Sequence, residues 1–296
     1  MEDLATVRTK RLHSLVNNFA AGTARISALS VTLSEVAYRV RREQWSMDYA
    51  ILKTHGYLPE PLTNFKIAPE CRGEFNRQIE KFNSLPRPKL SEFIATWGAG
   101  YINIMLATEV GMKETMEALL SSVLIDSWMA FEILASDLWV RAIDFGPSIL
   151  RKRLISRTLK SEKSDDPFDL VVPEDVPDLK SRPGSALREA RKVSFQRLPY
   201  IVRNYEIVFG SKVKTLFSEN NNYIVVLSAF RNVLIHNAGK VDSTFIKRMK
   251  GFPEFASIKP RQKLQLDGEL VAKLRETATT VGAKLIHFVD DVMTPT

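Results

Sequence analysis

Apolar residues recur every three or four positions along most of the chain, which is the spacing of one face of an α-helix. The clearest case is residues 113–145, where Met116, Leu120, Val123 and Leu124 begin a stripe that continues to Leu138. Alternating strand patterns joined by Asn-Gly or Asp-Gly turns are not visible. The sequence therefore predicts an all-α protein, with helices over residues 4–19, 31–52, 71–82, 113–145, 147–159, 185–209, 223–237 and 268–292.

Glycine and proline divide these helices. Gly146-Pro147 is expected to end the long helix, Pro199 to break the helix over 185–209, and Gly239 to end the helix over 223–237. Residues 161–184 contain four prolines and few core-forming residues, which predicts a long loop. We expect an N-terminal helical region over 1–110, followed by a helical domain over 111–296.

The composition is that of a globular protein, with 45% hydrophobic and 26% charged residues among 296. Cys71 is the only cysteine, so an intramolecular disulfide and a cysteine-rich zinc site are excluded. The first residues do not resemble a signal peptide. The most apolar window, residues 123–143, contains four charged side chains, which disfavours a membrane span. We expect a cytoplasmic protein that does not enter a membrane.

Positive charge is in excess and is clustered. The formal net charge is +8, and basic groups gather at 8–11, 39–42, 151–160, 188–192 and 247–250. A basic surface attracts polyanions such as nucleic acid. A well-solvated surface without a polyanionic partner is an equally good explanation of this charge.

The helix expected over 223–237 carries the most specific chemistry. Its apolar residues form one stripe, and Ser228, Asn232 and His236 lie on the opposite side at i, i+4 and i+8. An exposed helix face usually carries Glu and Lys, whereas here the neighbours are small or aliphatic. We therefore expect this second face to meet another surface, such as the partner in a homodimer.

The segment RNVLIHNAGKVD, residues 231–242, resembles the signature of the HEPN superfamily, in which an Arg and a His four to six residues later close a helix. Arg231, the following Asn232 and His236 match that signature. The aromatic and acidic pattern of residues 127–140 is also similar to members of this group. The resemblance covers residues 113 to the C-terminus, and Ala238 stands where some toxin members have Tyr.

The resemblance implies a helical bundle of HEPN type that dimerises and cleaves RNA without a metal or cofactor. His236 would be the general acid or base, Arg231 would bind the phosphate, and Asn232 would orient the ring or the sugar-phosphate. Glu132 and Ser228 are possible supporting residues. For Glu132, a place on the helix surface or in an interhelical salt bridge is the simpler explanation.

Three functions remain open at this stage. The first is a metal-independent endoribonuclease in cell defence or a toxin–antitoxin role, with RNA as substrate and a possible antitoxin or regulatory partner. The second is a catalytically inactive HEPN-like module that binds RNA, a nucleotide or a protein. The third is an unrelated helical adaptor. His13, His55, His287 and Cys71 are expected to be structural residues.

Overall fold

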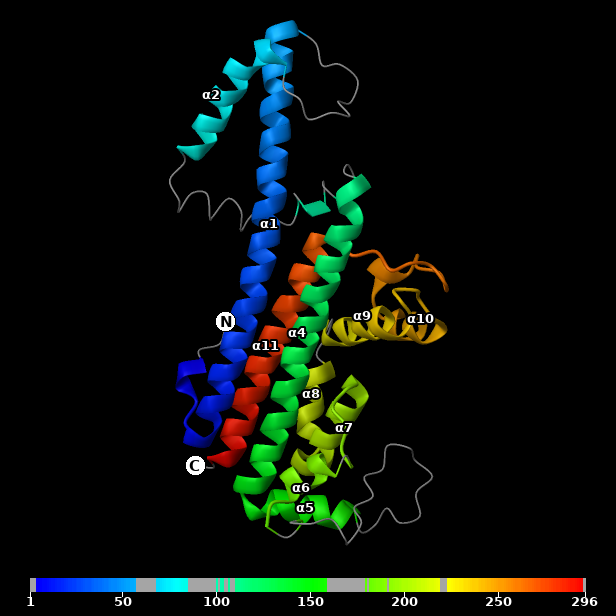
Figure 1. Cartoon of the computed structure of the whole chain (residues 1–296). Coiled ribbons are helices and arrows are strands. Elements are labelled where there is room, and N and C mark those ends of the chain that lie inside the picture. Colours follow the sequence, from blue (N-terminus) through cyan, green and yellow to red (C-terminus); the bar gives the residue numbers. More distant parts are fainter. Residues whose placement is uncertain are drawn as a thin grey trace. The chain divides into compact units, whose positions relative to one another are not determined.

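The computed structural model describes residues 4–56, 68–84, 100, 102–103, 106, 110–158, 179, 181–190, 192–218 and 223–294. These residues are almost entirely helical and none lies in a strand (Figure 1). The only β-type pairing among them is an isolated bridge between Lys240 and Lys263. The all-α prediction is therefore confirmed.

The N-terminal part of the chain differs from expectation. A single helix, α1 (His13–His55), runs for 43 residues where the sequence predicted two helices over 4–19 and 31–52. Gly22 lies inside α1, and one glycine lowers helix stability by only about 1 kcal/mol. No proline interrupts the segment, so the helix continues through it. The short helix predicted over 71–82 is confirmed as α2 (Arg72–Asn83).

The long apolar helix is confirmed as α4 (Val110–Phe145), and it is followed by α5 (Ser148–Thr158). A Cβ atom on Gly146 would lie 2.3 Å from the carbonyl oxygen of Ala142, so only glycine fits after the last turn. The predicted loop over 161–184 falls mostly outside the described residues. Its last residues already belong to α6 (Pro183–Glu189).

The helix predicted over 185–209 is in fact two helices, α6 and α7 (Leu198–Phe209). The described residues between the two helices, 190 and 192–197, are not helical, and they precede Pro199, which lies in the first turn of α7. Proline is tolerated there because the first N–H groups of a helix have no intrahelical partner. Pro199 therefore begins a helix instead of breaking one.

The remaining helices are α8 (Lys214–Ser218), α9 (Ile224–His236), α10 (Ser243–Met249) and α11 (Gly268–Met293). The predictions over 223–237 and 268–292 are confirmed within two residues at each end. Asp242 caps α10, because its side chain accepts a hydrogen bond from the backbone N–H of Phe245 at 2.7 Å.

The chain forms two compact units. Unit 1 contains residues 1–26, 122–265 and 273–296, and unit 2 contains residues 27–121 and 266–272. The first 26 residues thus share a unit with the later part of the chain, whereas the sequence suggested one N-terminal region over 1–110. In unit 2, Met47 and Ile51 of α1 pack with Cys71 and Phe75.

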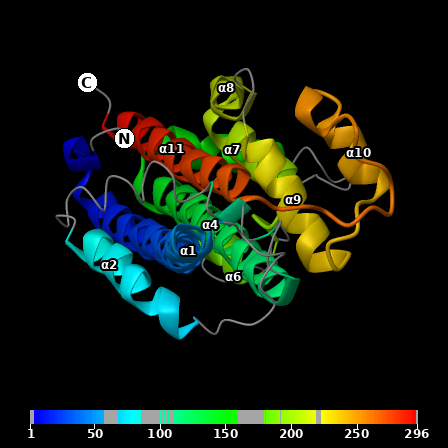
Figure 2. The same ribbon diagram turned by 90° about the horizontal axis from the view of Figure 1, so that it is seen from above.

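In unit 1 the first turns of α1, the second half of α4 and most of α11 lie side by side (Figures 1 and 2). They pack tightly at Gly282 of α11, where an added Cβ would lie 2.4 Å from Phe19 and 3.1 Å from Leu134. Asp290 of α11 binds the segment that precedes α1. Its carboxylate accepts hydrogen bonds from the backbone N–H groups of Arg8 and Thr9, at 2.9 and 2.8 Å.

Buried polar side chains attach α7 to α4. The indole of Trp139 donates to the carbonyl oxygen of Asn204 at 2.9 Å, and the hydroxyl of Tyr205 donates to that of Ala135 at 2.7 Å. Both aromatic side chains are fully buried. These bonds fix α7 on the core helix, and α7 is one wall of the candidate site.

Among the described helices, residues 113–145 of α4 are long and apolar enough to cross a membrane by length and composition alone. The core helix of a globular protein meets the same criteria. In unit 1, Trp128, Phe131 and Leu138 of this helix are fully buried against the rest of the chain.

Candidate functional site

The end of α9 places His236 at the surface. Ala238 and Gly239 adopt left-handed backbone angles, with φ of 48° and 77°, which turns the chain away from the helix. The N–H groups of Asn237 and Gly239 both donate to the carbonyl oxygen of Val233, at 3.1 Å each. This arrangement ends α9 directly after His236, and the imidazole is exposed.

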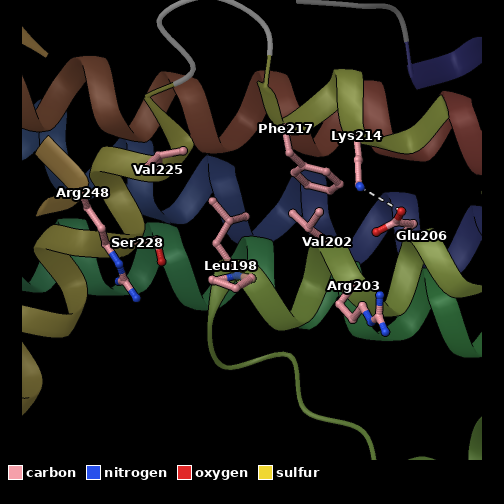
Figure 3. Close-up of a pocket in the computed structure, with 10 residues that line it drawn as sticks. Leu198, Val202, Arg203, Glu206, Lys214, Phe217, Val225, Ser228 and Arg248 are labelled. Atoms are coloured by element: carbon pink, nitrogen blue, oxygen red, sulfur yellow. Dashed lines mark ion pairs between the residues drawn. The ribbon is translucent and has the colours of Figure 1, made fainter. Parts of the chain in front are cut away.

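The polar row predicted on α9 lines two neighbouring cavities. Ser228 borders a cavity of about 580 Å³ between α7, α8, α9 and α10 (Figure 3). Asn232 and His236 border a second cavity of about 270 Å³ between α9 and α10. The i, i+4, i+8 spacing therefore directs all three side chains to hollow parts of the surface, as the helical period predicts.

Two arginines outside the predicted set belong to these cavities. Arg197 precedes α7 and lines the His236 cavity, and Arg248 of α10 lines both cavities. The sequence marks Arg248 only as one member of a basic cluster, and it gives no signal for Arg197. Both are distant from His236 in the sequence, so only the packing of α7 and α10 against α9 brings them near it.

Arg231 has a different environment. Its Nη2 atom lies 3.9 Å from the Oε2 atom of Glu132 on α4, and its Nη1 atom donates to Oδ1 of Asn232 at 3.3 Å. Only 14% of the Arg231 side chain is exposed. Glu132 also accepts a hydrogen bond from the indole of Trp128 at 2.8 Å. Arg231 and Glu132 therefore form a salt bridge between α9 and α4.

Burial raises the pKa of Glu132, and this effect outweighs the hydrogen bond from Trp128 and the positive charge of Arg231, which both lower it. Burial thus makes the charged form of this carboxyl group less favourable than it would be in water. The group remains in this position because it is the acceptor for a fully buried indole and the counter-charge for Arg231.

The two residues that carry the predicted signature do not line the same cavity. His236 and Asn232 line the smaller cavity, whereas Arg231 does not belong to its described lining. Asn232 is the link, because it lines that cavity and accepts a hydrogen bond from Arg231. Within one chain, Arg231 is a positioning residue for Asn232. The positively charged side chains that line the same cavity as His236, and that could bind a phosphate there, are those of Arg197 and Arg248.

The face predicted to meet a partner is partly covered by the chain itself. Ser228 and Ala229 are only 3% and 2% exposed. Ser228 is therefore already buried within the single chain, although its side chain still borders the larger cavity.

Large apolar side chains are instead exposed near Glu132 and Arg231. Met129 and Ile133 of α4 are 47% and 57% exposed, and Ile235 of α9 is 43% exposed. Met129 precedes Glu132 by three residues, Ile133 directly follows Glu132 and lies one turn after Met129, and Ile235 follows Arg231 by one turn. We call Met129, Ile133 and Ile235 the apolar rim.

Carboxylates near His236 are already engaged. Asp242 lines the His236 cavity, but it caps α10 and accepts a hydrogen bond from the Asn237 side chain at 3.0 Å. Nowhere in the described ranges do three His, Cys, Asp or Glu side chains gather as metal ligands.

Cys71 has a neighbour that the sequence did not reveal. Its sulfur lies 3.5 Å from Nε2 of His55, and the same nitrogen lies 3.8 Å from Glu70. A catalytic histidine would face its nucleophile and its acid through opposite nitrogens. Here one nitrogen faces both groups and the thiol is fully buried. Cys71 therefore packs in the core of unit 2, as predicted.

Comparison with known proteins adds no family to these observations, because no family model, no curated protein and no solved structure matches the chain.

Proposed function

We propose that this chain is an endoribonuclease of HEPN type that cleaves RNA without a metal ion. The observation that carries the proposal is the cavity in which His236, exposed at the end of α9, lies with Asn232, Arg197 and Arg248. It combines one imidazole that can accept or donate a proton, one neutral hydrogen-bonding group and two fixed positive charges. The resemblance of residues 231–242 to the HEPN signature supports the same assignment.

This set of groups fits cleavage that uses the 2′-hydroxyl of RNA. Neutral His236 accepts the proton of the 2′-hydroxyl while its oxygen attacks the adjacent phosphorus. The guanidinium groups of Arg197 and Arg248 offset the negative charge that grows on the phosphate oxygens. The bond to the 5′-oxygen breaks, and that oxygen takes a proton from water or from a second copy of the chain. A 2′,3′-cyclic phosphate remains.

The homodimer is part of this proposal. The apolar rim, Met129, Ile133 and Ile235, supplies exposed apolar surface beside the Arg231–Glu132 pair. Such side chains are typical of the core of protein interfaces. Two copies that meet through the rim would bring two sets of His236 and Arg231 to one basic surface. A role in defence, with an antitoxin or other regulatory partner, is proposed on the resemblance alone.

One observation favours the alternative, an inactive HEPN-like module that binds RNA. Arg231 is turned to Glu132 and away from the His236 cavity, which is not the arrangement of two side chains sharing one phosphate. A module of this kind would keep the positive cavity and bind RNA without cutting it.

Incubation of the full chain with RNA in EDTA distinguishes the two functions. We expect cleavage with 2′,3′-cyclic phosphate or 3′-phosphate ends, and no cleavage of DNA of the same sequence. His236→Ala is expected to lower the rate about 10²–10⁴-fold. The exposed ring contributes little to packing, so the circular dichroism spectrum and the midpoint of urea unfolding should be unchanged.

Arg231→Ala is expected to lose comparable activity, because Asn232 loses the hydrogen bond that positions it. His287→Ala is the matched control, since this histidine lies on α11 and outside the described lining of both cavities. Unchanged cleavage by His236→Ala, or cleavage that requires an added divalent metal, would refute the mechanism. Binding without cleavage would favour the inactive module.

A further inference from the structure

Apart from Arg248, the residues of the larger cavity have no part in the chemistry proposed at His236. This cavity holds about 580 Å³, which lies within the usual range for small-ligand pockets. Its described walls come from α7, α8, α9 and α10, all in unit 1. It is lined by Leu198, Pro199, Val202, Arg203, Glu206, Lys214, Phe217, Val225, Ser228 and Arg248 (Figure 3).

Its polar groups stand at opposite ends of an apolar middle. Figure 3 shows Arg248 and Ser228 at one end and the Glu206–Lys214 ion pair with Arg203 at the other, with Val202 and other apolar side chains between them. The Glu206–Lys214 pair is close, with Oε1 and Nζ 2.8 Å apart. A ligand that fits this lining has an apolar body, a negative group at one end and hydrogen-bonding groups at the other.

A nucleotide has this distribution of chemistry. The faces of its base are apolar and pack on aliphatic or aromatic side chains, of which Phe217 supplies a ring. Its phosphate is negative, and the base edge carries hydrogen-bond donors and acceptors. With the phosphate at Arg248, the base would lie over Val202 and Val225, and its edge would face Glu206.

Arg248 connects this cavity to the proposed cleavage site. It lines both cavities, so a phosphate bound to its guanidinium is adjacent to both. Along α9, Ser228 and His236 are eight residues apart, about 12 Å at 1.5 Å per residue. This separation is on the length scale of a dinucleotide. One strand can therefore pass from the larger cavity to His236.

We propose that the cavity between Arg248 and Glu206 binds one base of the RNA strand, and that Glu206 selects a base with an exocyclic amino group. This inference rests on the proposed function for the identity of the strand. A carboxylate accepts hydrogen bonds from the amino group of cytosine, and adenine carries an amino group too. Uracil presents a carbonyl oxygen at the equivalent position, which has no hydrogen to donate to the carboxylate. Cytosine and adenine are thus preferred to uracil.

The preference is measured by binding, which does not require cleavage. Fluorescein-labelled oligonucleotides of C, A or U alone, with 2′-O-methyl groups that block cleavage, are titrated with the full chain and followed by anisotropy. We expect the C and A strands to bind about tenfold or more tightly than the U strand. A strand of N4,N4-dimethylcytosine, which lacks the donor hydrogens, should bind no better than the U strand.

Two variants test where the preference arises. Val225→Trp fills the cavity, and Glu206→Gln replaces the acceptor with a group that also donates, so either change should bring the Kd values of the C and U strands within about twofold. Ile149→Trp is the control for Val225→Trp, because it adds the same side chain at an exposed position of α5, outside the described lining of both cavities and outside the apolar rim. It should keep the preference.

Equal binding of all strands by the wild-type chain, or a preference that survives both Glu206→Gln and dimethylation of cytosine, would overturn the inference. If Val225→Trp does not fold, as judged by circular dichroism, Glu206→Gln and the dimethylated strand still decide. Cleavage of unmodified RNA without a base preference would leave the proposed function intact and refute this inference. A base preference in binding without cleavage of unmodified RNA would support this inference and count against the proposed cleavage.

Discussion

The guanidinium of Arg231 on α9 lies 3.9 Å from the carboxylate of Glu132 on α4, and the same carboxylate accepts the indole N–H of Trp128. This contact attaches the helix that carries His236 to the core helix of unit 1. Arg231 does not belong to the described lining of the His236 cavity. One pair thus links the stability of unit 1 to the position of the proposed site.

Removal of the Glu132 side chain should destabilise unit 1 through Trp128. Glu132→Ala leaves a fully buried indole N–H without its acceptor, which costs about 1–3 kcal/mol. Glu132→Gln is the matched control: it retains an acceptor oxygen and should cost less than Glu132→Ala. Urea unfolding with unchanged m-values measures both free energies. Equal losses in the two variants would show that the hydrogen bond to Trp128 does not contribute.

The Glu132–Arg231 pair also predicts that stability depends on pH. Burial raises the pKa of Glu132, despite the hydrogen bond from Trp128 and the charge of Arg231. A carboxyl group with a raised pKa favours folding most when protonated, below its ordinary pKa of about 4.3, and this contribution is lost as pH rises through the folded value. The unfolding free energy of the wild type minus that of Glu132→Gln should therefore fall as pH rises through that window. A difference that is constant with pH would contradict the direction of the shift.

Asp290 should show the opposite dependence. Burial acts to raise the pKa of Asp290, but hydrogen bonds from Thr9 and Arg8 and the Arg8 charge outweigh it and hold the pKa below its usual range. Its stabilisation is present above the unfolded value of about 3.9 and is lost as pH falls through the folded value. At pH 7, Asp290→Asn should cost about 1–2 kcal/mol, and the loss should disappear in acid.

Asp291→Asn is the control for this change. Its carboxylate also contacts Arg8, at 2.7 Å, but its side chain is 75% exposed. Exposed ion pairs contribute little, so the urea midpoint should barely move. If Asp291→Asn were as costly as Asp290→Asn, the backbone hydrogen bonds to Asp290 would not be the source of the stabilisation.

Ala238→Gly should stabilise the chain. Ala238 has φ of 48°, a left-handed angle that costs an L-residue about 1 kcal/mol. Glycine removes this strain but loses more entropy on folding, so the expected net gain is about 0.5 kcal/mol. Ala256→Gly is the control: Ala256 is also exposed but has φ of −64°, and glycine there should destabilise. Thermal unfolding of the two variants should shift in opposite directions.

The sequence by itself determined the helices and the direction of their polar faces, because helical period, proline and glycine act over a few residues. The i, i+4, i+8 row of Ser228, Asn232 and His236 was visible for this reason, and Gly239 correctly marked the end of α9. Local signals were insufficient where they were weak or ambiguous. Gly22 did not divide α1, and Pro199 began α7, since both residues are compatible with a helix at those positions.

Only the tertiary structure decided which side chains meet. Glu132 and Arg231 are far apart in the sequence, and so are Arg197, Arg248 and His236. Their proximity depends on how α4, α7 and α10 pack on α9, which is set by shape and burial over the whole unit. The spacing between Arg231 and His236 was therefore a reliable guide to position along a helix. It did not reveal that the Arg231 side chain contacts Glu132 on α4, whereas the His236 side chain lines the smaller cavity.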